Sequence, residues 1–244
     1  CKPIINRLFS SVTYLITSNE GFSAWVVDPG DMDKLTPYLN NTHIYISGIL
    51  LTHAHFDHIY GLNEIIALFP TAKVYTNEFG RRMLLNEKMN LSKYHNSPFI
   101  FSREDSIESI SDGSKIELDN EIKAQAIYTP GHNPSCITWI IKNSLFTGDS
   151  YIPGIKTVTN LPASNKEQAR ISEEKIKSLS DDKLIYPGHL IPEIPWHSVQ
   201  YLFQDSALTG PGLPGLHRRQ RDTEDCRYAF RLRAECDRRT ENNR

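Results

Sequence analysis

The sequence predicts a layered α/β fold, an αββα sandwich in which two packed β-sheets are covered by helices. Short runs rich in Val, Ile, Leu, Tyr and Thr recur over residues 12–190, and a few longer helical segments lie between them. Runs of strands interspersed with a few helices fit two packed sheets covered by helices. The 244 residues are enough for one sizeable core, or for one domain with an appendage.

The predicted strands are the short apolar and β-branched runs, because these residue types are enriched in strands. In chain order they are Thr13–Thr17, Ala24–Asp28, Ser47–Thr52, Lys73–Thr76, Lys115–Leu118, Ile122–Tyr128, Cys136–Ile141, Ser144–Thr147 and Lys183–Tyr186. Helices are predicted between them, at Met32–Asn40, Asp57–Phe69, Glu78–Glu87 and Asn165–Leu179.

The helix predicted over Asp57–Phe69 has an amphipathic pattern. Its apolar residues fall on one stripe, which is formed by Ile59, Leu62, Ile65, Ile66 and Phe69. Asp57 lies at the start of this helix, where an aspartate side chain can cap the first turn. Capping does not prevent Asp57 from having a second, chemical role.

The chain changes character from about Asp205. The segment Gly210–Gly215 is rich in Gly and Pro, which is typical of a linker. After it come nine arginines and no lysine, whereas the body of the chain prefers lysine. We therefore predict one domain over residues 1–204, followed by a tail over 205–244 that is disordered or foreign to the domain.

Composition narrows the class of partner. The formal net charge of −2 argues against a general polyanion binder, so we expect no nucleic-acid partner. No apolar run approaches the ~20 residues that a membrane-spanning helix requires, so we expect no membrane partner. The four cysteines include no CxxC pair, which fits a reducing cytoplasm better than a disulfide framework. We expect a cytoplasmic protein that acts on a small molecule; composition leaves its oligomeric state open.

Histidines and an aspartate are concentrated in the segment Thr52–His58. His53 and His55 lie two residues apart where a strand runs out, so they point the same way, and Asp57 and His58 follow on the next turn. Neutral imidazoles and carboxylates are the ligands of zinc and other borderline divalent metals. Because the cluster holds more donors than one tetrahedral ion accepts, it predicts two ions side by side.

Three later segments add donors of the same kind, each after a short apolar run. They place His132 in a Pro-Gly turn, Asp149 after a glycine, and His189 in a second Pro-Gly turn. Loops at strand ends are where a rigid sheet can aim functional side chains. The order HxHxDH, GH, GD, GH resembles the metallo-β-lactamase-fold hydrolases, and especially their glyoxalase II (hydroxyacylglutathione hydrolase)-like branch. The resemblance covers roughly residues 12–190.

The resemblance implies a binuclear metal site. The matching ligands are His53, His55 and His132 for the first ion, Asp57, His58 and His189 for the second, and Asp149 as the carboxylate that bridges both. Asp28 matches a family residue that orients the ligands from behind the site. A plain turn at the end of a strand is the alternative explanation of Asp28.

The implied activity is metal-dependent hydrolysis. Two divalent ions, expected to be zinc with iron or manganese as alternatives, lower the pKa of a bridging water and give hydroxide near neutral pH. This hydroxide attacks a thioester or ester-like carbonyl, and Asp57 is expected to orient the water as a catalytic residue. No GxSxG motif offers a protein nucleophile. The alternatives in the same fold are β-lactam or lactone hydrolysis and a mononuclear-iron persulfide dioxygenase. A non-catalytic binding module is the other functional class. It would lack some of the metal ligands, whereas all seven are present here.

The segment after residue 88 bears on the substrate. Asn90–Tyr94 resembles a segment that runs beside the active-site mouth in short glyoxalase II-like hydrolases. Lys93, Tyr94 and His95 are therefore candidate substrate contacts. The alternative is that they are solvated loop residues, because loops carry polar residues in any case.

Two turns depart from the pattern of this branch. Where the family usually has Gly-Arg-Thr-Asp-Leu-Pro, the chain has Thr157–Pro162, with Val158 for the arginine and Asn160 for the aspartate. The first histidine turn reads His132-Asn133-Pro134-Ser135 rather than His-Thr-x-Gly. The helical domain with which full-length glyoxalase II enzymes bind glutathione is not recognisable either. We expect intact ligands, with a glutathione thioester as only one candidate substrate.

Overall fold

The computed structural model describes residues 1–17, 22–42, 44–95, 97–119 and 122–190. All of them belong to one compact unit, Cys1–Leu202. The tail predicted over residues 205–244 lies outside the described residues, so its order and its origin stay predictions.

The first sheet has six strands in the order β1-β2-β3-β4-β5-β6. The pairs β1–β2 and β2–β3 are antiparallel, and the pairs from β3 to β6 are parallel. The central strands are mostly buried, as expected where both faces of a parallel sheet are covered. The bounds are β1 Lys2–Ile5, β2 Val12–Thr17, β3 Ser23–Val27, β4 Tyr45–Leu50, β5 Lys73–Thr76 and β6 Ile107–Ser109.

The second sheet has five strands in the order β11-β10-β9-β8-β7. Only the edge strand β11 pairs in parallel, and the other pairs are antiparallel. The bounds are β7 Lys115–Asp119, β8 Ile122–Tyr128, β9 Ile137–Ile141, β10 Ser144–Gly148 and β11 Leu184–Pro187.

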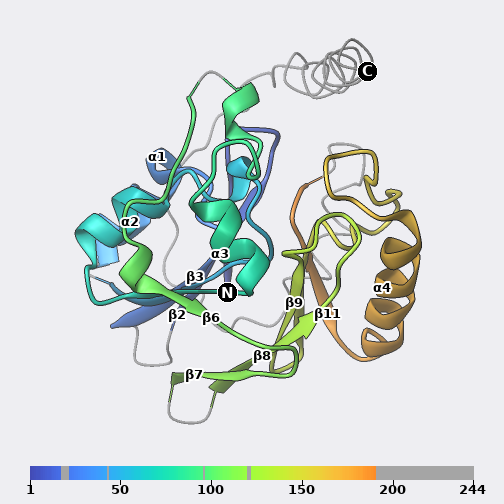
Figure 1. Ribbon diagram of the computed structural model, residues 1–244. Coiled ribbons are helices and arrows are strands. Elements are labelled where there is room, and N and C mark those ends of the chain that lie inside the picture. The colour runs from blue at the N-terminus through green and yellow to red at the C-terminus, as the bar shows by residue number, and fades with distance from the viewer. Residues whose placement is uncertain (18–21, 43, 96, 120–121, 191–244) are drawn as a thin grey trace, which may run out of the picture. The chain divides into compact units, whose positions relative to one another are not determined.

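The helices form the outer layers (Figure 1). α1 (Met32–Thr42), α2 (Leu62–Leu68) and α3 (Glu78–Leu84) bury their apolar faces against the first sheet in one continuous core. α4 (Lys166–Leu179) lies beside the second sheet, where its Ser172 hydroxyl donates to the Pro130 carbonyl at 2.6 Å. The αββα fold predicted from the sequence is confirmed.

Hydrogen bonds join the two sheets at the end of β4. The indole Nε1 of Trp139 on β9 donates to the Leu51 carbonyl at 2.9 Å. The Ile137 amide donates to the Thr52 carbonyl at 2.7 Å. Both acceptors lie directly before His53, so the second sheet fixes the point at which the donor segment begins.

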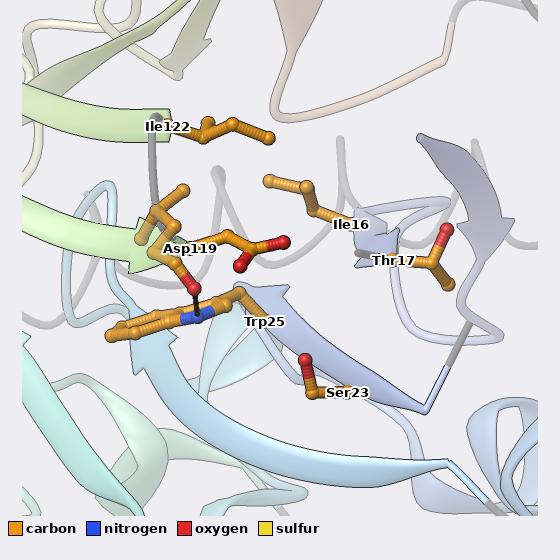
Figure 2. Close-up of a pocket in the computed structure, with 7 residues that line it drawn as sticks. Ile16, Thr17, Ser23, Trp25, Asp119 and Ile122 are labelled. Atoms are coloured by element: carbon orange, nitrogen blue, oxygen red, sulfur yellow. Dashed lines mark hydrogen bonds between the residues drawn. The ribbon is translucent and has the colours of Figure 1, made fainter. Parts of the chain in front are cut away.

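A third contact between the sheets lies at the opposite strand ends. Trp25 Nε1 on β3 donates to the Leu118 carbonyl at 2.9 Å, beside a small pocket that Ile16 and Ile122 also line (Figure 2). At their other ends, β2 and β3 contact the turns that carry the donors, β2 through Val12 and β3 through Asp28. This pocket is therefore separate from the predicted metal site.

The helix predicted over Asp57–Phe69 is wrong as a single element. The structure has a 3-10 turn at Phe56–His58, and α2 begins only at Leu62. The break lies at Gly61, whose amide donates to the Pro29 carbonyl at 2.7 Å and whose Cβ, if present, would lie 2.8 Å from that oxygen. Asp57 caps neither element, because neither has a side-chain cap.

Smaller differences concern edges and ends. The edge strands β1 and β6, of four and three residues, were not predicted. α3 ends at Leu84 rather than Glu87, and α1 extends to Thr42 rather than Asn40. α4 begins as predicted, with the Asn165 side chain accepting from the Gln168 amide.

Candidate metal centre

The predicted donors gather at one end of the two sheets. The segment Thr52–His58 follows β4, and Asp28 follows β3. His132, Asp149 and His189 follow β8, β10 and β11 of the second sheet. Because the two sheets pack at the exit of β4, turns far apart in sequence meet there, and the structure brings all seven predicted ligands together.

The first group consists of His53, His55 and His132. All three are buried, and one ring nitrogen from each lies within 4.8 Å of the other two. The closest approach is 3.0 Å, between His132 Nε2 and His55 Nδ1. Three convergent imidazoles of this kind could hold one divalent ion.

The second group consists of Asp57, His58 and His189, with ligand atoms again within 4.8 Å of one another. His58 Nε2 lies 3.3 Å from His189 Nε2. Asp57 Oδ2 lies 3.5 Å from the first of these nitrogens and 3.4 Å from the second. The 3-10 turn at Phe56–His58 is what turns Asp57 and His58 toward the same point.

Asp149 contacts both groups. Its Oδ2 lies 3.6 Å from His132 Nε2 and 3.3 Å from His189 Nε2. Its Oδ1 lies 3.6 Å from His58 Nε2. This carboxylate is therefore placed between the two groups, where a bridging ligand would have to lie.

Asp28 follows β3 and contacts the segment Thr52–His58. Its two oxygens accept from the Thr52 amide at 2.7 Å and from the Thr52 hydroxyl at 2.5 Å. Its Oδ2 also lies 3.1 Å from His58 Nδ1. By distance Asp28 could form a further metal group with His53 and His58. Both of its oxygens are already engaged by Thr52, however, so its position suits orientation of His58 better.

Main-chain carbonyls hold two other rings. His189 Nδ1 donates to the Phe9 carbonyl at 2.9 Å, and His132 Nδ1 donates to the Val158 carbonyl at 3.0 Å. Phe9 has a left-handed backbone, with φ of 52°. Sequence reasoning missed both contacts, because a carbonyl leaves no signal in residue type.

The site fits a metal because two of its buried atoms lack partners. His53 Nε2 and Asp149 Oδ1 have no hydrogen-bond partner among the described residues. The Thr52 hydroxyl donates to Asp28, so it accepts from His53 Nδ1 at 3.2 Å and leaves Nε2 unprotonated. A buried acceptor without a partner costs about 1–3 kcal/mol, which a divalent cation at this point would offset.

The electrostatics separate the two groups. Burial and repulsion from neighbouring histidines hold the pKa of His53 and His55 well below the ordinary value, so both are neutral, as ligands must be. Burial alone would lower the pKa of His189, but the carboxylates of Asp149 and Asp57 raise it to about 10. Burial likewise opposes ionisation of Asp149, yet His189, His58 and His132 hold its pKa well below the ordinary range.

The candidate substrate contacts lie in and beside a 3-10 turn at Ser92–Tyr94. Lys93 is exposed and pairs with Glu87 at 3.5 Å, and the Tyr94 side chain is 49% exposed. His95 lies beside the donor segment, where its ring stacks on Phe56 with centroids 5.2 Å apart. The role of these residues in binding substrate stays a prediction.

The comparison with known proteins identifies the family. Residues 6–189 match the family model described as the metallo-beta-lactamase superfamily. The chain belongs to the metallo-beta-lactamase superfamily. The predictions of the family and of a metal-dependent hydrolase within it are thereby confirmed. Among the described residues, no helix is both long and apolar enough to cross a membrane.

Two curated relatives of this superfamily member have hydrolase names. The chain is 28% identical over 206 residues to the probable polyketide biosynthesis zinc-dependent hydrolase PksB of Bacillus subtilis. This match covers 83% of this chain and 84% of PksB. It is 29% identical over 186 residues to a hydroxyacylglutathione hydrolase of Hydrogenovibrio crunogenus. That match covers 75% of this chain but only 60% of the relative, so the chain spans less than two thirds of that enzyme.

Solved structures agree on the fold of this superfamily member. The crystal structure of the BLEG-1 B3 metallo-beta-lactamase superposes with a TM-score of 0.70 at 24% sequence identity. The superposition covers 78% of this chain and 91% of that chain. At this identity the likeness establishes the shared fold alone.

Proposed function

We propose that the protein hydrolyses a thioester or ester-like small molecule at a binuclear metal site. The observation that carries this proposal is the position of Asp149, within 3.6 Å of His132 in one donor group and of His58 and His189 in the other. A carboxylate between two groups of three donors suits two adjacent ions. The zinc-dependent hydrolase among the relatives supports zinc as the metal.

The chain's own residues have separate roles in the proposed reaction. When bound, the two ions supply an activated water and a Lewis acid for the carbonyl oxygen. Asp28 and the carbonyls of Phe9 and Val158 fix the rings of His58, His189 and His132, so that each keeps one nitrogen toward the centre. Asp57 lies among the second group of donors, where its carboxylate is placed to orient the attacking water.

The alternatives differ in metal content or substrate. A mononuclear-iron persulfide dioxygenase would hold one iron, so metal analysis separates it from the proposed hydrolase. β-Lactam or lactone hydrolysis would use the same site, and a substrate panel separates these reactions. The cytoplasmic location expected from the cysteine pattern, and the absence of nucleic-acid and membrane partners, stay predictions.

The proposed substrate class predicts a specificity. We expect the metal-loaded protein to hydrolyse a simple aryl thioester or ester with a higher kcat/KM than S-lactoylglutathione. Val158 replaces the family's usual arginine, and anchoring a remote anionic group supplies binding energy that an enzyme uses at the reacting centre. Steady-state kinetics with both substrates, with and without a chelator, measure this ratio. A kcat/KM for S-lactoylglutathione near ~10⁸ M⁻¹s⁻¹ would identify a true glyoxalase II instead.

Metal uptake should release protons at pH 7. With its pKa at about 10, His189 is protonated in the metal-free protein, and it must lose that proton to bind a metal. We expect about one proton per chain from this residue, and a metal affinity that falls as the pH is lowered. Calorimetry in two buffers of different ionisation enthalpy counts the protons, and equal heats in both buffers would contradict the assignment.

The raised pKa of His189 also makes the stability of the metal-free fold depend on pH. Because the folded pKa of about 10 exceeds the ordinary 6.5, the stabilisation from this ion pair is fully present below pH 6.5. It is lost as the pH rises through about 10.

A further inference from the structure

The proposed reaction does not use the side chains of Tyr60 and His95, which lie next to each other beside the donor segment. The Tyr60 hydroxyl donates to the Ser97 carbonyl at 2.7 Å and lies 3.1 Å from His95 Nδ1. We propose that these two residues form a substrate-binding pair, in which His95 Nε2 accepts a hydrogen bond from the substrate and Tyr60 positions the His95 ring. This inference rests on the proposed function and deepens it, because it assigns a neutral N–H or O–H donor to the substrate.

The hydrogen bonds of Tyr60 fix the proton of His95. A phenol hydroxyl has one hydrogen, and Tyr60 donates it to the Ser97 carbonyl. The contact between this hydroxyl oxygen and His95 Nδ1 is therefore a hydrogen bond in which Nδ1 is the donor. A neutral imidazole with its proton on Nδ1 has its lone pair on Nε2. The Tyr60 hydroxyl thus makes Nε2 of His95 an acceptor.

This acceptor is left for a ligand. Among the described residues, Nε2 of His95 has no hydrogen-bond partner, and it is not one of the buried side-chain atoms that lack a partner. Solvent therefore reaches the nitrogen, and the His95 side chain as a whole is half-buried. A donor group that arrives with the substrate can take the place of that solvent.

The His95 ring lies against the donor segment. It stacks on the ring of Phe56, which directly precedes Asp57, with an interplanar angle of 26°. Phe56 also meets Phe9 edge-on, with centroids 5.7 Å apart, and the Phe9 carbonyl holds the ring of His189. These contacts place His95 on the side of the second donor group, to which Asp57 and His189 belong.

The loop over residues 92–99 is held at its base independently of Tyr60. The Ser92 hydroxyl accepts from the Phe99 amide at 2.8 Å, and Asn90 Nδ2 donates to the Phe99 carbonyl at 3.0 Å. The Asn90 carbonyl accepts in turn from the Phe56 amide at 3.0 Å, which ties the base of the loop to the donor segment. We therefore expect the base to stay in place when the Tyr60 hydroxyl is removed.

Matched variants separate the acceptor from the ring. His95→Phe keeps a ring against Phe56 and removes the acceptor, whereas His95→Gln places an amide oxygen close to the position of Nε2. Tyr60→Phe keeps its ring and removes only the hydroxyl. The control is Tyr128→Phe, because the Tyr128 hydroxyl also donates to a main-chain carbonyl, that of Ile110. If His95→Phe does not fold, His95→Leu takes its place.

Two pairs of thioesters, each differing by one hydrogen-bond donor, locate that donor on the substrate. Lactoyl and propionyl S-phenyl thioesters differ by a hydroxyl on the acyl side. Propionyl thioesters of N-acetylcysteamine and of its N-methyl derivative differ by an N–H on the thiol side. The kcat/KM of each is measured on zinc-loaded protein, and NMR of nitrogen-labelled histidines reports the tautomer of His95.

We expect the wild type to favour the donor-bearing member of at least one pair by about 2–10-fold in kcat/KM, which is the effect of one neutral hydrogen bond. His95→Phe should abolish that preference and His95→Gln should retain it. Tyr60→Phe should reduce the preference and give a mixture of tautomers at His95. The same change should have no effect in the His95→Phe background, because Tyr60 acts through His95. Tyr128→Phe should leave the preference as it is.

Three results would overturn the inference. They are equal kcat/KM values within both pairs for the wild type, a preference that survives in His95→Phe, and a neutral His95 ring that carries its proton on Nε2. If the zinc-loaded wild type hydrolyses none of the thioesters, the proposed function fails instead, so the two failures are distinguishable.

Discussion

Asp149→Ala is expected to empty at least one metal position and to reduce kcat/KM by more than the ~100-fold typical of losing an outer partner of a ligand. Asp149 lies within 3.6 Å of histidines in both donor groups, so the carboxylate would offset charge on both ions. Two cations ~4 Å apart repel strongly without it, because even two unit charges at that distance interact by about 4 kcal/mol at an effective dielectric constant of ~20.

Elemental analysis of the purified variant measures the effect, with kinetics on the same sample. Asp181→Ala is the control, because it makes the same substitution at an exposed position next to the second sheet's edge strand. If Asp149→Ala keeps the full metal content of the wild type, Asp149 does not bridge the two ions.

Gly188→Ala is expected to have a comparably large effect, through packing rather than charge. A Cβ at this position would lie 2.2 Å from Asp149 Oδ1, 2.9 Å from the carbonyl carbon of Gly148 and 3.0 Å from His58 Cε1. The backbone cannot move away easily, because the Gly188 amide donates to the Gly148 carbonyl and its carbonyl accepts from the Val12 amide. The carboxylate must therefore be displaced.

We expect Gly188→Ala to lose metal and about 1–3 kcal/mol or more of unfolding free energy. Gly154→Ala is the matched control, since that glycine has φ of 80° but no atom within 4 Å of the position that a Cβ would occupy. It should cost only the backbone strain of a left-handed residue, about 1–3 kcal/mol, with metal content unchanged. Full metal content in Gly188→Ala would contradict the close packing of Gly188 against Asp149.

The layered fold and the donor set could be predicted from the sequence because both leave regular signals. Apolar runs mark the strands, and the turns that follow β4, β8, β10 and β11 carry His, Asp and Gly. These turns meet because the strands end at the same edge. The position of the donors at the strand ends therefore predicted that the metal ligands would cluster.

Other features depend on tertiary contacts that the sequence does not reveal. The pattern of Asp57–Phe69 is helical throughout, but the close approach of Pro29 to Gly61 divides it, and this contact joins segments far apart in the chain. The carbonyls of Phe9 and Val158 hold two rings without any residue-type signal.

The central claim is that these seven donors hold two metal ions, and elemental analysis of protein never exposed to a chelator tests it most directly. The donor set predicts close to two transition-metal ions per chain, zinc or iron, with thioester hydrolysis lost on their removal and restored on their return. A metal content near zero in folded protein would contradict it.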